Sequence, residues 1–215
     1  MQMNTKKLVE RFLEYVKIDT QSDENSTSYP STEKQLTLSR LLVKELKELG
    51  LSDVELTEHG YVFATLPSNL PEEKSASTPV IGFIAHVDTS PDVSGENVKP
   101  IIHKNYQGEE ISLPEDPTQK IGLDTDPALK NCIDHDVITA DGTTLLGADN
   151  KAGVAEIMTA MEYLVNNKDI KHGTIKIAFT VDEEVGTGTK YFDVQKFGAK
   201  YAYTIDGETA GEIED

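Results

Sequence analysis

The segment PVIGFIAHVDTSPD, Pro79 to Asp92, decides the fold. From Pro79 to His86 it is a nearly continuous apolar run, which is typical of a central strand covered on both faces. Asp88 follows His86 by two residues, so the two side chains are expected on the same face of the extended chain. A carboxylate beside a metal-bound imidazole fixes the tautomer of the ring. Taken alone, however, a His-x-Asp pair is more often a strand end followed by an unrelated turn aspartate.

Two amphipathic helices and a hairpin are predicted before this strand. Apolar residues recur at helical spacing in two groups: Leu8, Val9, Phe12, Leu13 and Val16, then Leu38, Leu41, Leu42, Leu46 and Leu49. Thr32 and Gln35 form a capping-box pair before the second helix, and Gly50 stands where its C-cap belongs. A hairpin is expected to turn at residues 59–60, and the Pro-, Ser- and Glu-rich stretch 67–79 predicts a surface loop.

The second half of the chain continues the alternation of strands and helices. Residues 90–141 are rich in Pro, Gly and Asp and contain only short strand-like pieces. A helix is expected to begin just after Asp149, one strand to end at Thr180 and a short strand to end at Asp206. Helices interspersed with apolar strands predict an α/β sandwich.

The segment LLGADNKAG, residues 145–153, places Asp149 directly before a helix. An aspartate at that point is commonly an N-cap. It could also bridge two metal ions with its two oxygens, and a helix N-terminus supports an ionised carboxylate. The two interpretations are compatible.

The segment FTVDEEVGTG, residues 179–188, carries three consecutive acids, Asp182, Glu183 and Glu184. Close carboxylates raise one another's pKa unless a cation neutralises them. A solvated acidic turn would explain them, but the two glycines that follow indicate a tight loop approaching another group. Adjacent glutamates could divide the work, one binding metal and the other moving a proton.

The segment YTIDGE ends a strand at Asp206, and alone it is an ordinary turn signal. Each of the four polar segments, however, follows a strand, and ligand sites form at that edge of an open α/β sheet. Their order along the chain is His-x-Asp, Asp, Glu-Glu, Asp. Together the segments resemble the di-zinc peptidase superfamily that includes carboxypeptidase G and aminoacylase. With the long insertion that holds DHDVITADGTTLLG, residues 134–147, the chain is similar along essentially its whole length to the peptidase T family of tripeptide aminopeptidases.

The resemblance implies a three-layer α/β/α sandwich with a mixed central sheet, incomplete in this chain, and two zinc ions per subunit. The implied metal ligands are His86 and Asp206 for one zinc, Glu184 for the other, and Asp149 for both. Asp88 would orient the imidazole, and Glu183 would be the general base that moves the proton of the zinc-activated water. Nitrogen and oxygen ligands suit zinc, and two metals can stabilise both ends of a hydrolytic transition state.

The resemblance also implies parts that this chain does not contain. Residues 1–207 correspond to the N-terminal part of the catalytic domain and residues 208–215 to the start of a lid, which supplies dimer contacts in a homodimer. The second zinc of the family takes a later histidine, so that site is incomplete here. The other histidines, His59, His103, His135 and His172, are expected at the surface. We therefore expect the 215-residue chain alone to be inactive.

The composition excludes some classes of binding partner and indicates the cellular compartment of the protein. The net charge of −18, from 38 acidic and 20 basic residues, argues against nucleic acid and against anionic membranes. Cys132 is the single cysteine, and the N-terminus lacks the apolar core of a signal peptide, so a cytoplasmic protein is expected. The partner expected is a small peptide substrate.

Two other functions remain open at this stage. One is an N-acyl or N-succinyl amino acid deacylase with the same zinc chemistry, against which the insertion between Asp88 and Asp149 weighs. The other is a non-catalytic metal-binding domain, against which the glutamate pair weighs, since Glu183 has no structural need.

Overall fold

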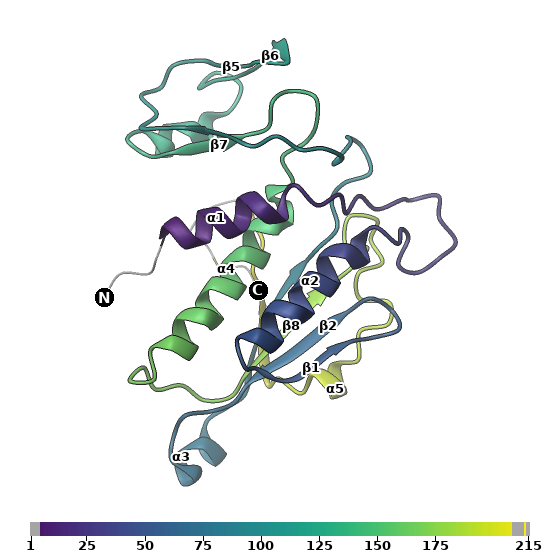
Figure 1. Ribbon diagram of the computed structural model, residues 1–215, viewed down its shortest axis with the longest axis vertical. Coiled ribbons are helices and arrows are strands. Elements are labelled where there is room, and N and C mark those ends of the chain that lie inside the picture. Colours follow the sequence, from purple (N-terminus) through teal and green to yellow (C-terminus); the bar gives the residue numbers. More distant parts are fainter. Residues whose placement is uncertain (1–4, 208–212, 214–215) are drawn as a thin grey trace.

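The computed structural model describes residues 5–207 and 213, and its centre is a five-stranded sheet (Figure 1). The strand order is β1-β2-β8-β3-β9. The strands are β1 (Ser52–Leu56), β2 (Val62–Leu66), β8 (Ile175–Thr180), β3 (Ile81–His86) and β9 (Tyr201–Thr204). The pairs β1/β2 and β2/β8 are antiparallel, whereas β8/β3 and β3/β9 are parallel. The predicted α/β architecture with a mixed central sheet is confirmed.

Three long helices lie together on one side of the sheet (Figure 1). They are α1 (Thr5–Tyr15), α2 (Gln35–Glu48) and α4 (Ala148–Asn166). Leu38, Leu42 and Leu46 of α2 are fully buried at the spacing of successive helical turns, as the apolar pattern predicts. Gly50 follows α2 with a φ of 81°, and its N–H donates to the carbonyl of Lys47, so the predicted C-terminal glycine is confirmed.

The predicted capping box at the start of α2 is wrong. The hydroxyl of Thr32 donates to the carbonyl of Gln21 at 2.6 Å, and the helix begins after Lys34 with no side-chain cap. The side-chain NH₂ of Gln35 donates to Asp182, which is 147 residues away in the sequence, and also to the Thr32 hydroxyl at 3.2 Å. Thr32 and Gln35 are therefore in contact, but neither side chain caps the helix.

The stretch 67–79 is not wholly a loop, because it contains the short helix α3 (Glu72–Ser77). Glu72 and Glu73 lie in its first turn, where acidic side chains are favoured by the helix dipole. A second short helix, α5 (Val194–Phe197), is capped by Asp193, which accepts a hydrogen bond from the N–H of Lys196. Phe197 packs closely against Gly82 of β3, where a Cβ atom would lie 2.6 Å from the ring.

The Pro- and Gly-rich stretch forms a lobe with two small hairpin-like sheets, next to α1 in Figure 1. Its elements are β4 (Ile101–His103) paired with β7 (Val137–Thr139), β5 (Ile111–Leu113) paired with β6 (Asp116–Ile121), and the 3-10 helix η1 (Pro127–Cys132). Tyr106, Ile111 and Leu129 form its own small core. The prediction of only short strands in this stretch is confirmed. In the part of the chain described, no helix has the length and apolar character needed to cross a bilayer.

The parallel strands bring the polar segments to one edge. His86 at the end of β3 lies opposite Thr180 at the end of β8, and Ile84 of β3 lies opposite Thr204 at the end of β9. The residues that follow β8 and β9 therefore emerge beside His86. This is the edge at which open α/β sheets form ligand sites.

Candidate metal centre

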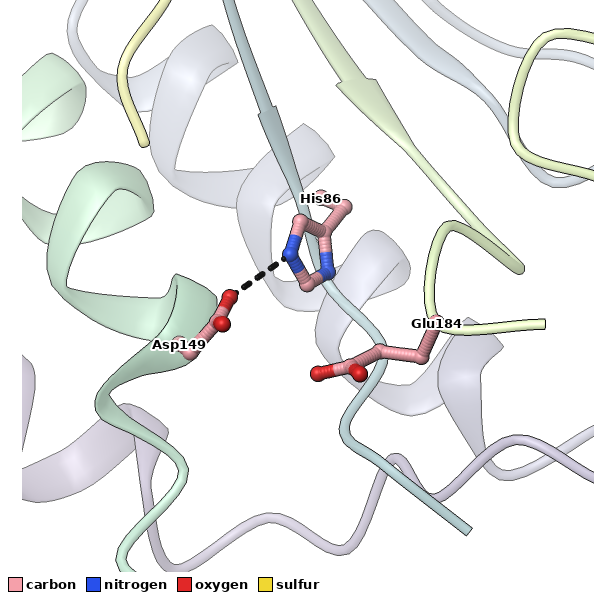
Figure 2. A group of neighbouring side chains, drawn as sticks. All are labelled: His86, Asp149 and Glu184. Atoms are coloured by element: carbon pink, nitrogen blue, oxygen red, sulfur yellow. Dashed lines mark hydrogen bonds and ion pairs between the residues drawn. The ribbon is translucent and has the colours of Figure 1, made fainter. Parts of the chain in front are cut away.

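His86 is the centre of a cluster of carboxylates. It ends β3 and is only 3% exposed, since the sheet and the following loops enclose it. Its Nε2 atom lies 2.9 Å from Oδ1 of Asp149, 3.5 Å from Oδ2 of Asp206 and 3.7 Å from Oε2 of Glu183. Figure 2 shows the imidazole and the side chains of Asp149 and Glu184 turned toward a common space.

Asp149 reaches this space because α4 begins irregularly. Gly147 adopts a left-handed conformation at a φ of 79°, and Asp149 itself is extended, with φ and ψ of −80° and 108°. The regular helix starts only after Asn150, as the sequence predicts. The Asp149 side chain is 72% exposed, so one of its faces is open to solvent while Oδ1 meets His86.

Asp88 ties the histidine to the glutamate pair. It is fully buried, and its two oxygens accept the backbone N–H groups of Glu183 at 3.0 Å and Glu184 at 3.1 Å. Its Oδ1 atom lies 3.3 Å from Nδ1 of His86, and that nitrogen is also 3.1 Å from the Asp88 carbonyl. Sequence spacing predicts the contact with His86 but not the two bonds from the glutamate backbone.

The third acid of the DEE run does not belong to the cluster. Asp182 is 1% exposed and points away from His86, toward Ser31 and Gln35, which hydrogen-bond its carboxylate. The repulsion expected among three consecutive acids therefore applies only to Glu183 and Glu184. Nothing local in the sequence signals this difference, because Ser31 and Gln35 are about 150 residues earlier in the chain.

Asp206 lies beside His86 because the backbone just before it is hydrogen-bonded to β3. The N–H of Ile205 donates to the carbonyl of Ile84 at 2.7 Å, which continues the β9 pairing up to Asp206. The Ile205 carbonyl packs on Gly153 of α4, where a Cβ atom would lie 2.0 Å from the oxygen. Only glycine fits between this helix and this strand end. The glycine belongs to the quoted segment 145–153, although the sequence alone does not reveal its neighbour.

A buried lysine, Lys151, follows Asp149 by two residues in α4. Lys151 is 1% exposed, and its Nζ donates to the carbonyl of Ile18 at 2.7 Å. Burial lowers the pKa of Lys151 to about 8, against the opposing effect of Asp19 and Asp88. Its ammonium ties the chain that follows α1 to the first turn of α4.

The cluster has more carboxylates than its single imidazole can neutralise, and the pKa values of several of its groups are shifted. Burial raises the pKa of Glu184 to about 7, and the charge of Asp149 adds to the effect. Burial lowers the pKa of His86, but hydrogen bonds to Asp206 and Asp88 outweigh it and raise the value to about 11. The hydrogen bond from His86 in turn lowers the pKa of Asp206. Protons therefore take up part of the charge that a metal cation would neutralise.

The donor set fits a zinc ion. One ligand atom each from His86, Asp149 and Glu184 lie within 4.8 Å of one another, and Asp206 adjoins the same imidazole nitrogen. A neutral imidazole and carboxylates are ligands that zinc prefers. Within residues 5–207 and 213, this is the one group of His, Cys, Asp and Glu side chains with such spacing. It contains none of the other four histidines.

Comparison with known proteins agrees with this geometry. The chain is 57% identical over 209 residues to peptidase T of Alkaliphilus oremlandii, covering 97% of this chain and 51% of that protein. It is 58% identical over 214 residues to peptidase T of Aliivibrio salmonicida, covering 97% of this chain and 50% of that protein. The chain is therefore similar to peptidase T over almost its whole length. It spans about half the length of the curated peptidase T proteins that it matches.

Solved structures share the fold of this chain. Aminopeptidase PepT of Bacillus cereus superposes with a TM-score of 0.67 at 29% identity, covering 96% of this chain and 44% of that structure. A tripeptidase of Staphylococcus aureus superposes with a TM-score of 0.68 at 26% identity, covering 97% and 45%. Residues 132–215 also match the M42 glutamyl aminopeptidase family.

Proposed function

We propose that a polypeptide containing this chain, at the length of its relatives, is a metallo-aminopeptidase that releases the N-terminal residue of tripeptides. We call it the full-length polypeptide. The observation that carries the proposal is the convergence of His86, Asp149 and Glu184 within 4.8 Å in a chain homologous to peptidase T. The substrate class comes from the relatives, one of which is a tripeptidase.

The proposed cofactor is two zinc ions per subunit. The residues that would hold them are His86 and Asp206 for one ion, Glu184 for the other, and Asp149 for both. When bound, zinc supplies a Lewis acid that polarises the peptide carbonyl and makes water a stronger nucleophile. Asp88 holds the imidazole so that Nε2 faces the ligand cluster, since Nδ1 is engaged by Asp88 itself.

Glu183 is the proposed general base. Its carboxylate is 56% exposed and lies 3.7 Å from Nε2 of His86, whereas its backbone N–H is fixed by Asp88. It would take a proton from the attacking water and return it to the leaving amine. A base in this role contributes about 10²–10⁴-fold to the rate.

The proposed domain division follows the family resemblance. Residues 1–207 would be the N-terminal part of the catalytic domain, and residues 208–215 would begin the lid and dimerisation domain. Apart from residue 213, this second segment lies outside the described residues. A homodimer is proposed for the full-length polypeptide.

A substrate panel tests the proposal. The full-length polypeptide with zinc should cleave free tripeptides such as trialanine faster than N-acetylated or N-succinylated amino acids. Glu183→Gln should abolish most of that turnover and leave the zinc content unchanged, because Glu183 is not a proposed ligand. Faster hydrolysis of the acylated amino acids would favour the deacylase alternative. Full turnover by Glu183→Gln would remove Glu183 as the base.

A further inference from the structure

The proposed general base stands beside a buried carboxylate that faces the other way. Asp182 leaves β8 with a φ of 56°, a left-handed conformation that few residues other than glycine adopt. This turn directs the side chain of Asp182 into the protein and the side chain of Glu183 toward His86. Aspartate tolerates this conformation, and at Asp182 buried partners fix the direction of its side chain.

Residues at the start of α2 and just before it fix the position of the Asp182 carboxylate. Oδ2 of Asp182 accepts the backbone N–H of Ser31 at 2.7 Å, and Oδ1 accepts the Ser31 hydroxyl at 2.5 Å. Oδ1 also accepts a hydrogen bond from the side-chain NH₂ of Gln35 at 2.7 Å, while the N–H of Asp182 donates to the side-chain oxygen Oε1 of Gln35 at 3.1 Å. Gln35 is fully buried and Ser31 is 9% exposed, so water does not substitute for these bonds.

We propose that Ser31 and Gln35 are positioning residues for the general base Glu183, acting through Asp182. The inference rests on the function proposed above. A metal ligand such as Glu184 would be held in place by its own bond to the ion. Glu183 has no such bond. Its position depends on how the backbone is fixed on either side, by the contacts of Asp182 and by the hydrogen bonds from the N–H groups of Glu183 and Glu184 to Asp88. Loss of the Asp182 contacts should therefore affect Glu183 more than the metal ligands.

Gln35→Met in the full-length polypeptide tests this directly. The variant keeps the length of the side chain but removes both hydrogen bonds to Asp182. We expect kcat to fall about 10–100-fold, the usual cost of losing such an outer partner, with KM and zinc content unchanged. Ser31→Ala, which keeps the backbone bond to Oδ2, should show a smaller loss of the same kind. It also serves as the reporter if Gln35→Met does not fold.

The matched control is Ser39→Ala. Ser39 is also fully buried on α2, but its hydroxyl donates to the carbonyl of Gly60 and not to Asp182. Its kcat should equal that of the unaltered polypeptide even if its melting temperature falls.

A double variant separates positioning from general stability. In the Glu183→Gln background, Gln35→Met should cause no further loss of kcat, because the group that it positions is already absent. An equal loss in both backgrounds would overturn the inference, as would an unchanged kcat in a folded Gln35→Met variant. Full turnover by Glu183→Gln alone would remove Glu183 as the base and the inference with it. Faster hydrolysis of acylated amino acids than of tripeptides would overturn the proposed function instead, so the two failures are distinguishable.

Discussion

Oδ1 of the buried Asp88 lies 3.0 Å from the backbone nitrogen of Glu183 and accepts its N–H. The same carboxylate accepts the N–H of Glu184 and adjoins Nδ1 of His86. One buried acid therefore sets the position of the imidazole and of the glutamate loop together. A change at Asp88 should affect metal binding and proton transfer at once.

Asp88→Asn should reduce the turnover of the full-length polypeptide about 10–100-fold and weaken zinc binding. Asparagine offers one acceptor oxygen and one NH₂ donor, so one of the two backbone N–H groups would face another donor. Steady-state kinetics and zinc titration measure the two effects. Asp92→Asn, at an exposed position in the same segment, is the matched control and should change neither. Normal turnover and zinc affinity in Asp88→Asn would refute the shared role.

Zinc affinity of the 215-residue chain should rise with pH between about 6 and 8. The pKa of Glu184 is raised to about 7, chiefly by burial, so the group holds a proton below that pH and has lost it above. The proton competes with the metal, and binding must displace it. Calorimetry in two buffers of different ionisation enthalpy should show more protons released at the lower pH. His86 must also lose a proton on binding, but it holds that proton throughout this range. Equal proton release at both pH values would therefore show that Glu184 is not a ligand.

Gly153→Ala should displace Asp206 from His86. The added Cβ would meet the Ile205 carbonyl at 2.0 Å, so either α4 or the end of β9 must move. We expect weaker zinc binding and a free energy of unfolding lower by about 1–3 kcal/mol. Gly122→Ala is the control, since its Cβ would have only one neighbour, at 3.8 Å. If Gly153→Ala binds zinc like the unaltered chain, the contact does not position Asp206.

The 215-residue chain alone should not cleave trialanine at saturating zinc. Glu184 and Asp149 are the two proposed ligands of the second zinc in this chain, and catalytic zinc sites usually have three. The other histidines of the described residues lie outside the metal group. Turnover close to that of the full-length polypeptide would show that another residue of this chain completes the site.

The elements that follow from local pattern were predictable from the sequence. The apolar runs ending at His86 and Thr180 and the leucine spacing of α2 all match the structure. The start of the helix after Asp149 also matches, because a Gly-Ala turn precedes it. Glu72 and Glu73 after a proline also indicate the start of a helix. The helix was not predicted because the stretch is rich in Ser and Pro, which favour a loop.

Partners distant in the sequence were not predictable. Thr32 and Gln35 have the spacing of a capping box and bond each other, yet they do not cap the helix, and Gln35 also bonds Asp182, 147 residues away. For the same reason the sequence groups Asp182 with Glu183, whereas the structure turns it away. The residues that line the metal centre are visible in motifs, whereas the residues that hold them are visible only after folding.

The most direct test of the metal centre is anomalous diffraction at the zinc edge from crystals of this chain grown with zinc. We expect an anomalous peak at bonding distance from Nε2 of His86, with carboxylate oxygens of Asp149 and Asp206 as further ligands at about 2.0–2.2 Å. A crystal with zinc bound elsewhere and none at His86, at saturating metal, would contradict the proposed metal centre.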